Sequence, residues 1–321
     1  ENNHYYSESV ILEFSIDNAK YTYEGGIIDN DHITTVNSEF HNDKRFDVEY
    51  LQNGDNVLNF NNATVSHKEG EEPSKIHFSE VYSNSGDTEV NINSSNLNWL
   101  DIRTNTGKDK IDIKSSNLNN VTIDTRNGND TININGGTHE KNEINAGFGN
   151  DVININGGVF NKETIYLGIN SDILNITGTK ADHVKMTDMY LRTGSGEKDE
   201  INIKYADIDS TYKNSANHII AESKNNTVNV ENSNLKGINI GTETNTGTDV
   251  NRNPLNFDLN LKSSTLDDVN LNTIYKTHVV VDGDTKINGS YPENATKWNF
   301  ADTDDTLELR SGTLNDMTIN L

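Results

Sequence analysis

Residues 131–156 read TININGGTHEKNEINAGFGNDVININ, and the opening segment TININ returns at the end as VININ. In both segments apolar residues alternate strictly with polar ones. This period of two is typical of a strand with one buried face. Equivalent positions in the two segments, such as Ile134 and Ile155, lie 21 residues apart. The same interval continues on both sides, so this stretch is part of a longer repeat.

Three rows of anchor residues follow the repeat. They are Ile92, Ile113, Ile134, Ile155 and Ile176; then Leu97, Leu118, His139 and Phe160; then Ile102, Ile123, Ile144 and Ile165. A short strand cannot bury its apolar face alone, so a fixed repeat of strands predicts stacked coils around one core. We therefore predict an all-β, single-stranded parallel β-helix, or β-solenoid, with coils of about 21 residues. The general preference for right-handed crossovers predicts a right-handed winding, and His139 is interpreted as a tolerated irregularity in its row.

Three regions are expected along the chain. We predict irregular first coils and a cap for residues 1–83, and the regular coils for residues 84–176. In residues 177–321 the anchor spacing lengthens, which predicts loop insertions near 177–190, 209–218, 241–256 and 288–297. The chain begins without Met and its last coil carries a full set of anchors, so we expect a piece of a longer, processed protein.

Composition narrows the classes of partner. The chain has 321 residues, a formal net charge of −24 and no cysteine. This charge argues against binding to nucleic acids, whose affinity comes largely from Lys and Arg on phosphates, and against docking on anionic lipid. No run of 18 apolar residues occurs, so we expect no membrane insertion of this segment. An acidic chain without cysteine suits an extracellular setting.

An aspartate precedes several first-row anchors by four residues. The regular examples are Asp109, Asp130, Asp151 and Asp172. The segment from Gly147 to Asn154, GFGNDVIN, resembles the nonapeptide G-x-G-x-D-x-U-x of RTX proteins, and the resemblance implies bound Ca²⁺ at these aspartates. Stacked carboxylates repel one another, and Ca²⁺ favours oxygen ligands. The alternative interpretation is that each aspartate caps its own turn by hydrogen bonding.

Asparagines recur beside the anchors, at Asn133, Asn154 and Asn175 among others. Stacked on one face, they predict a ladder of side-chain amides. Such a ladder is either a self-satisfied, solvated face or a surface on which copies of the chain associate.

The second half carries aromatic residues in or near the expected insertions. These are Tyr190, Tyr205, Tyr212, Tyr291 and Trp298. Aromatic faces beside Asn and Asp suit a glycan-binding surface, because one side is apolar and the rim is polar. Aromatic residues under loops also form small satellite cores, so both interpretations stay open.

An enzyme is the alternative to a binding module. β-Helical polysaccharide lyases and hydrolases need acids and bases that converge on one face. Here the arginines share no repeat position, and the sequence contains no nucleophile elbow, Walker A motif or zinc signature. An active site would require convergence between the insertions at 177–190 and 241–256.

From about residue 54 to residue 321 the repeat, the Asn/Thr/Gly-rich faces and the acidic charge resemble passenger domains of bacterial autotransporters and other large β-helical surface adhesins. The resemblance implies an exported protein at the bacterial cell surface with a role in attachment, aggregation or biofilm. We therefore predict a surface-interaction module that binds glycans, a cell-surface receptor or copies of itself. A carbohydrate-active β-helix enzyme is the second hypothesis, and a self-associating structural module is the third.

Overall fold

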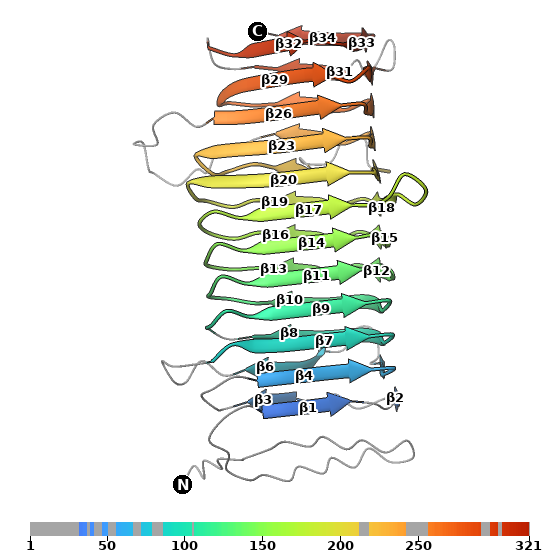
Figure 1. The fold of residues 1–321 in the computed structure, drawn as a ribbon, viewed down its shortest axis with the longest axis vertical. Coiled ribbons are helices and arrows are strands. Elements are labelled where there is room, and N and C mark those ends of the chain that lie inside the picture. Colours follow the sequence, from blue (N-terminus) through green and yellow to red (C-terminus); the bar gives the residue numbers. More distant parts are fainter. Residues whose placement is uncertain are drawn as a thin grey trace.

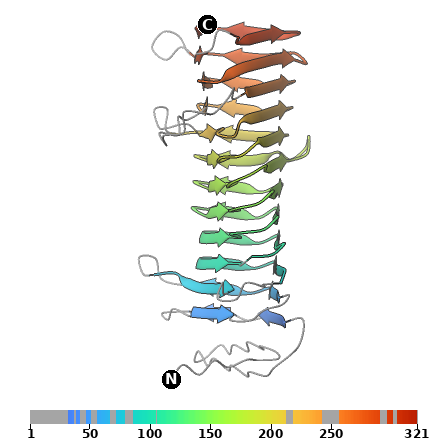
Figure 2. The same ribbon diagram turned by 90° about the vertical axis from the view of Figure 1, so that its left-hand side faces the viewer.

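The fold is a parallel β-solenoid, as predicted. The computed structural model describes residues 32–36, 39–41, 47–50, 56–66, 72–78, 86–104, 106–211, 218–241, 256–289, 296–300 and 304–320. These residues form strands β1 to β34, and none of them is helical. Figures 1 and 2 show the strands lying across the long axis of the molecule, with β1 near one end and β34 near the other. Every strand pairing is parallel, and the right-handed winding stays a prediction.

The strands fall into three stacks that run along the solenoid. The first stack contains β1 (His32–Val36), β4 (Asn56–Asn61), β7 (Thr88–Asn93), β9 (Lys110–Lys114), β11 (Thr131–Asn135), β14 (Val152–Asn156), β17 (Ile173–Thr177), β20 (Lys198–Lys204), β23 (Asn225–Glu231), β26 (Asn256–Lys262), β29 (Lys276–Asp282) and β32 (Thr306–Leu309). It forms a continuous sheet along one side of the molecule (Figure 1).

The second and third stacks close each coil. The second contains β2 (Glu39–His41), β5 (Thr64–Ser66), β8 (Asn96–Arg103), β10 (Asn117–Asp124), β12 (Thr138–Glu140), β15 (Val159–Asn161), β18 (Val184–Thr187), β21 (Ala206–Asp209), β24 (Asn234–Lys236), β27 (Thr265–Asp267), β30 (Thr285–Asn288) and β33 (Gly312–Asn315). The third contains β3 (Asp47–Tyr50), β6 (Ser74–Phe78), β13 (Glu143–Asn145), β16 (Thr164–Tyr166), β19 (Tyr190–Arg192), β22 (Ile219–Ile220), β25 (Asn239–Gly241), β28 (Asn270–Asn272), β31 (Thr296–Asn299) and β34 (Met317–Asn320). Strands β8 and β10 run through both stacks.

The strand register matches the predicted anchor rows. Ile113 pairs with Ile92 and Ile134, and Ile134 pairs with Ile155, so these side chains stack directly on one another. All are buried, as are the residues of the other two rows. His139 is buried in its row, stacked on Phe160 with ring centroids 4.6 Å apart, and its Nε2 lies 3.0 Å from the carbonyl oxygen of Gly136. Its interpretation as an irregularity in the core is confirmed.

The lengthened coils keep the same stacks. Ile203 pairs with Ile176 and with Val230, each 27 residues away, so the extra residues leave the solenoid as connections between strands. The insertions predicted at 209–218, 241–256 and 288–297 fall before β22, β26 and β31, whereas the one predicted at 177–190 also covers β18 and reaches Tyr190 of β19. Strands β1 to β6, within the region 1–83 predicted as irregular coils and a cap, join the same three stacks. Residues 1–31 of that region lie outside the described residues.

The sequence analysis did not predict one of the coils. Strands β29, β30 and β31 place Val281, Ile287 and Trp298 in the three anchor rows, at steps of six and eleven residues where the regular coils use five and five. The irregular steps conceal this coil, and for that reason the prediction assigned Trp298 to a loop. Trp298 is instead fully buried, and its indole nitrogen donates to the carbonyl oxygen of Val269 at 3.1 Å. The prediction that Trp298 contacts a ligand was therefore wrong.

Within the described part of the chain, no helix has the length and apolar character that crossing a membrane requires.

Two isoleucines on opposite faces of the first stack test this packing. Ile134 is buried, whereas Ile173 on β17 is 37% exposed. We expect Ile134→Ala to lower the free energy of unfolding by about 2–5 kcal/mol, because it leaves a cavity between coils. The same change at Ile173 should cost no more than about 0.5 kcal/mol. Urea unfolding followed by circular dichroism measures both, and equal losses would contradict the assignment of inner and outer faces.

Candidate functional site

The predicted aspartates form a column at the corner that leads into the first stack. We call Asp109, Asp130, Asp151, Asp172 and Asp199 the aspartate column. Each side chain is almost completely buried. In each, Oδ1 accepts the backbone N–H of the equivalent residue one coil earlier, at 2.7–3.0 Å; for example, Asp151 accepts from Asp130. The aspartates therefore join successive coils where the chain turns out of the strand ladder.

This geometry corrects one sequence interpretation. One interpretation was that each aspartate caps its own turn, but these hydrogen bonds reach back to the preceding coil. The reason is that at this corner the N–H of one coil has no strand carbonyl above it, and a buried N–H needs an acceptor. The pattern extends to Asp305, whose Oδ1 accepts the N–H of Thr277 at 2.7 Å.

Burial raises the pKa values of these carboxyls. Loss of hydration raises the pKa of Asp109 to about 7, of Asp130 to about 6 and of Asp151 to about 7. The same cause raises the pKa of Asp172 to about 8 and that of Asp199 to about 6, although the backbone hydrogen bond each accepts acts in the opposite direction. In Asp109, Asp130, Asp151 and Asp172 the second oxygen, Oδ2, is buried without a hydrogen-bond partner. Neutral carboxylic acids suit this environment better than carboxylates do.

Calcium fits this column poorly. Ca²⁺ takes six to eight oxygen ligands, whereas each aspartate has one oxygen already committed to a backbone N–H. Among the described residues, no group of three or more His, Asp or Glu side chains is arranged to hold a metal ion. The calcium interpretation of Asp109, Asp130, Asp151 and Asp172 stays a prediction, and it requires that millimolar Ca²⁺ raise the melting temperature.

The predicted asparagine ladder is present on the outer face of the first stack. Asn154 donates from Nδ2 to Oδ1 of Asn133 at 2.8 Å, and Asn175 donates to Asn154 at the same distance. The chain of amides continues through Asn202, Asn229 and Asn260, always donating toward the earlier coil. Each amide thus satisfies part of its capacity within the stack. Self-association through Asn133, Asn154 and Asn175 stays a prediction.

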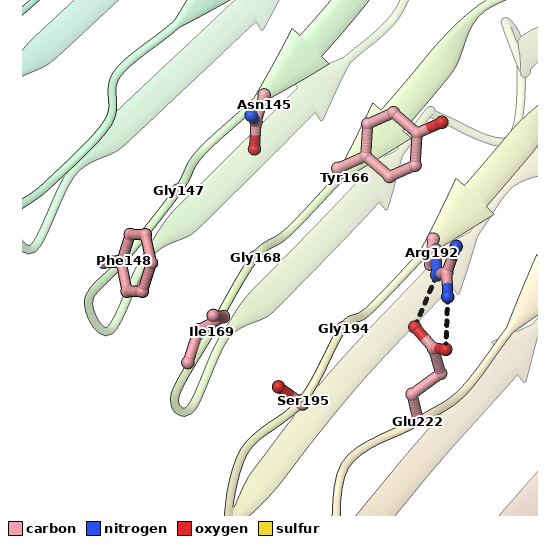
Figure 3. A pocket seen from close by; sticks show the side chains of 10 residues that line it. All are labelled: Asn145, Gly147, Phe148, Tyr166, Gly168, Ile169, Arg192, Gly194, Ser195 and Glu222. Carbon is pink, nitrogen blue, oxygen red and sulfur yellow. Dashed lines mark hydrogen bonds and ion pairs between the residues drawn. The ribbon is translucent and has the colours of Figure 1, made fainter. Parts of the chain in front are cut away.

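A groove lies where the third stack passes into the turns before the first stack. Its volume is about 390 Å³. Phe148 and Ile169 pair across neighbouring coils in these turns, and their side chains are 57% and 38% exposed. Beside them, Tyr166 and Arg192 pair at the ends of β16 and β19. Figure 3 shows Phe148, Ile169 and Ser195 along the turns, and Asn145, Tyr166 and Arg192 at the strand ends.

An ion pair closes one end of the groove. The guanidinium of Arg192 donates to both carboxylate oxygens of Glu222, at 2.5 and 2.6 Å. The Glu222 side chain is only 5% exposed, so this bidentate pair is held rigidly. The groove therefore offers an apolar surface at one end and fixed polar groups at the other (Figure 3).

Glycines allow the turns beneath the groove to stack closely. Gly147 has a φ of +95°, and a Cβ there would lie 1.8 Å from the carbonyl oxygen of Arg126. The N–H of Ile169 donates to the carbonyl oxygen of Gly147 at 2.7 Å. These contacts fix the positions of Phe148 and Ile169.

Among the described residues, the predicted ligand-binding aromatics Tyr190 and Tyr205 lie at different places on the solenoid. Tyr190 packs edge-on against Tyr166 of the groove, with ring centroids 5.9 Å apart. Tyr205 lies at a different corner, beside His183 and Lys204. Tyr212 and Tyr291 lie outside the described residues. Sequence reasoning missed Phe148 as a surface residue, although it is an aromatic residue where equivalent turns carry Thr106, Asn127 and Ser195.

One serine–histidine pair among the described residues is not arranged as a nucleophile with its general base. Ser210 Oγ lies 2.8 Å from Nε2 of His218, and Nδ1 of His218 accepts the N–H of Asn239. With Nδ1 as acceptor, a neutral His218 carries its proton on Nε2 and donates to Ser210, which prevents it from acting as a base there. Most of the 241–256 insertion, where an active site would require side chains to converge, lies outside the described residues.

Comparison with protein-family models, with curated proteins and with solved structures finds no match. The resemblance to autotransporter passengers and to RTX repeats therefore stays a prediction, and function has to be argued from the geometry.

Two glycine substitutions test the close stacking beneath the groove. We expect Gly157→Ala to cost about 1–2 kcal/mol, since its φ of +77° is unfavourable for alanine but its Cβ would meet nothing within 4 Å. Gly147→Ala adds a clash with the backbone of Arg126 and should cost about 1–3 kcal/mol more. Urea unfolding of both variants measures the difference, and equal costs would contradict the stacking of these turns.

Proposed function

We propose that the protein is an extracellular surface-interaction module of the bacterial cell surface that binds glycans in the groove beside Phe148 and Tyr166. The observation that carries the proposal is an exposed apolar surface, formed by Phe148 and Ile169 on neighbouring coils. The Arg192–Glu222 ion pair borders this surface. Sugar rings combine an apolar face with a polar rim, and aromatic rings beside fixed hydrogen-bonding groups complement both. The solenoid acts as the scaffold that holds these groups in position.

Net charge supports this class of ligand. The chain carries −24, which favours neutral glycans over strongly anionic polymers. The groove itself places Arg192 opposite Glu222, so it presents a paired charge and not a free cation. Attachment to cells, aggregation or biofilm formation would follow from such binding at a surface.

An array of neutral and charged glycans probed with the purified protein tests the proposal. We expect Phe148→Ala to weaken binding about tenfold, equivalent to about 1.4 kcal/mol. Val159→Ala is the matched control, because Val159 is 45% exposed and does not line the groove. Equal losses in the two variants, or no bound glycan at all, would contradict the proposal.

Self-association is the second candidate, favoured by the continuous amide ladder. It predicts concentration-dependent sedimentation of the wild type that Asn154→Asp abolishes, because the added charges would repel between copies. A wild type that sediments as a monomer at every concentration would rule it out.

A further inference from the structure

We propose that the aspartate column regulates the groove by protonation: neutral carboxyls hold the turns of the groove together, and ionised ones loosen them. This inference rests on the proposed function of the groove. It goes beyond that function because it assigns the site a response to acidity.

The column and the groove share the same turns. The turn that carries Phe148 ends at Asp151, and the turn that carries Ile169 ends at Asp172. Asp172 accepts the N–H of Asp151, so the column joins the two turns that carry the exposed side chains of Phe148 and Ile169. Repulsion between these aspartates would therefore act on the same two turns that carry Phe148 and Ile169.

Ionisation places like charges in a buried stack. Neighbouring coils are separated by about 4.8 Å, the usual spacing of paired strands. Carboxylates at this spacing repel one another, and burial weakens screening by solvent. The unpartnered Oδ2 atoms of Asp151 and Asp172 have no hydrogen-bond donor to stabilise a negative charge. A neutral acid removes the repulsion while Oδ1 keeps accepting its backbone N–H.

The groups around the column do not neutralise it. The charged groups that act on it within the described residues are themselves acidic: Asp87 near its first member and Glu222 near its last. Hydroxyls also lie beside it. Those of Thr104 and Thr125 donate to the carbonyl oxygens of Thr125 and Ala146, and that of Ser223 donates to Asp199. Among the described residues, no hydroxyl donates to Asp151 or Asp172 in the middle of the column.

The direction of the pH dependence follows from proton linkage. Because burial raises the pKa of the column to about 6–8 from the ordinary 3.8, the folded chain binds more protons than the unfolded chain between about pH 4 and pH 8. Stability therefore falls as the pH rises through this interval. Glu163, whose pKa burial raises to about 8, acts in the same direction. Burial lowers the pKa of His139 and His218, which act in the opposite direction.

A double variant, Asp151→Asn with Asp172→Asn, isolates the column from these other groups. Asparagine keeps an acceptor oxygen and cannot ionise, and Asn226 already occupies the equivalent position of a later coil, as the pairing of β20 with β23 shows. We expect the wild-type melting temperature to fall by roughly 5 °C or more between pH 5.5 and pH 8.5, and that of the variant to fall by less than half as much. Carbon-13 NMR of the wild-type carboxyls gives an independent readout if the variant folds poorly.

Binding to the glycan array at pH 5.5 and pH 8.5 completes the test. We expect wild-type binding to weaken about fivefold or more at the higher pH, and binding by the double variant to change little. Equal wild-type binding at both pH values, or carboxyl signals that titrate near 3.8, would overturn the regulation while leaving the binding function intact. No bound glycan at either pH, with a column that titrates as expected, would overturn the proposed function itself.

Discussion

The solenoid depends on satisfying the backbone N–H groups at its corners. Along the strands each N–H finds a carbonyl of the neighbouring coil, but at a corner the chain leaves this ladder. Short side chains of the next coil supply the missing acceptor. Aspartates do so before the first stack, and serines do so before the second, where Ser95 accepts from Ala63 and Ser116 accepts from Ser95. Between the second and third stacks Asn142 accepts from Val121.

The inside and the outside of each coil therefore require different kinds of residue. The interior needs branched apolar side chains in rows and small polar acceptors at the corners, and both demands recur in every regular coil. The exterior carries the asparagine ladder on one side and a groove on another. Phe148 and Ile169 break the polar pattern of their turn position, and this break distinguishes the groove from the rest of a repetitive surface. Recognition is therefore expected where the repeat is interrupted.

The sequence predicts the fold well because strand alternation and coil length both leave a periodic signal. The pairing of Ile92, Ile113, Ile134 and Ile155 follows directly from their spacing. The coil that ends with Trp298 is missed because its anchors are unevenly spaced, and a buried tryptophan was then taken for a surface one. Spacing also cannot show which N–H an aspartate will bind. The groove combines residues from four coils, up to Glu222, and only the exposed position of Phe148 could have indicated it.

Hydrogen exchange at the corner amides tests the central claim most directly. The amides to compare with the strand amide of Ile134 are those of Thr88, Asp109, Asp130, Asp151 and Asp172. At pH 6, where most of the column is neutral, we expect these five amides to exchange within about tenfold of Ile134, because each is buried and hydrogen-bonded to a side chain of the next coil. Exchange at the rate of an exposed loop would contradict the role of the aspartates in joining the coils.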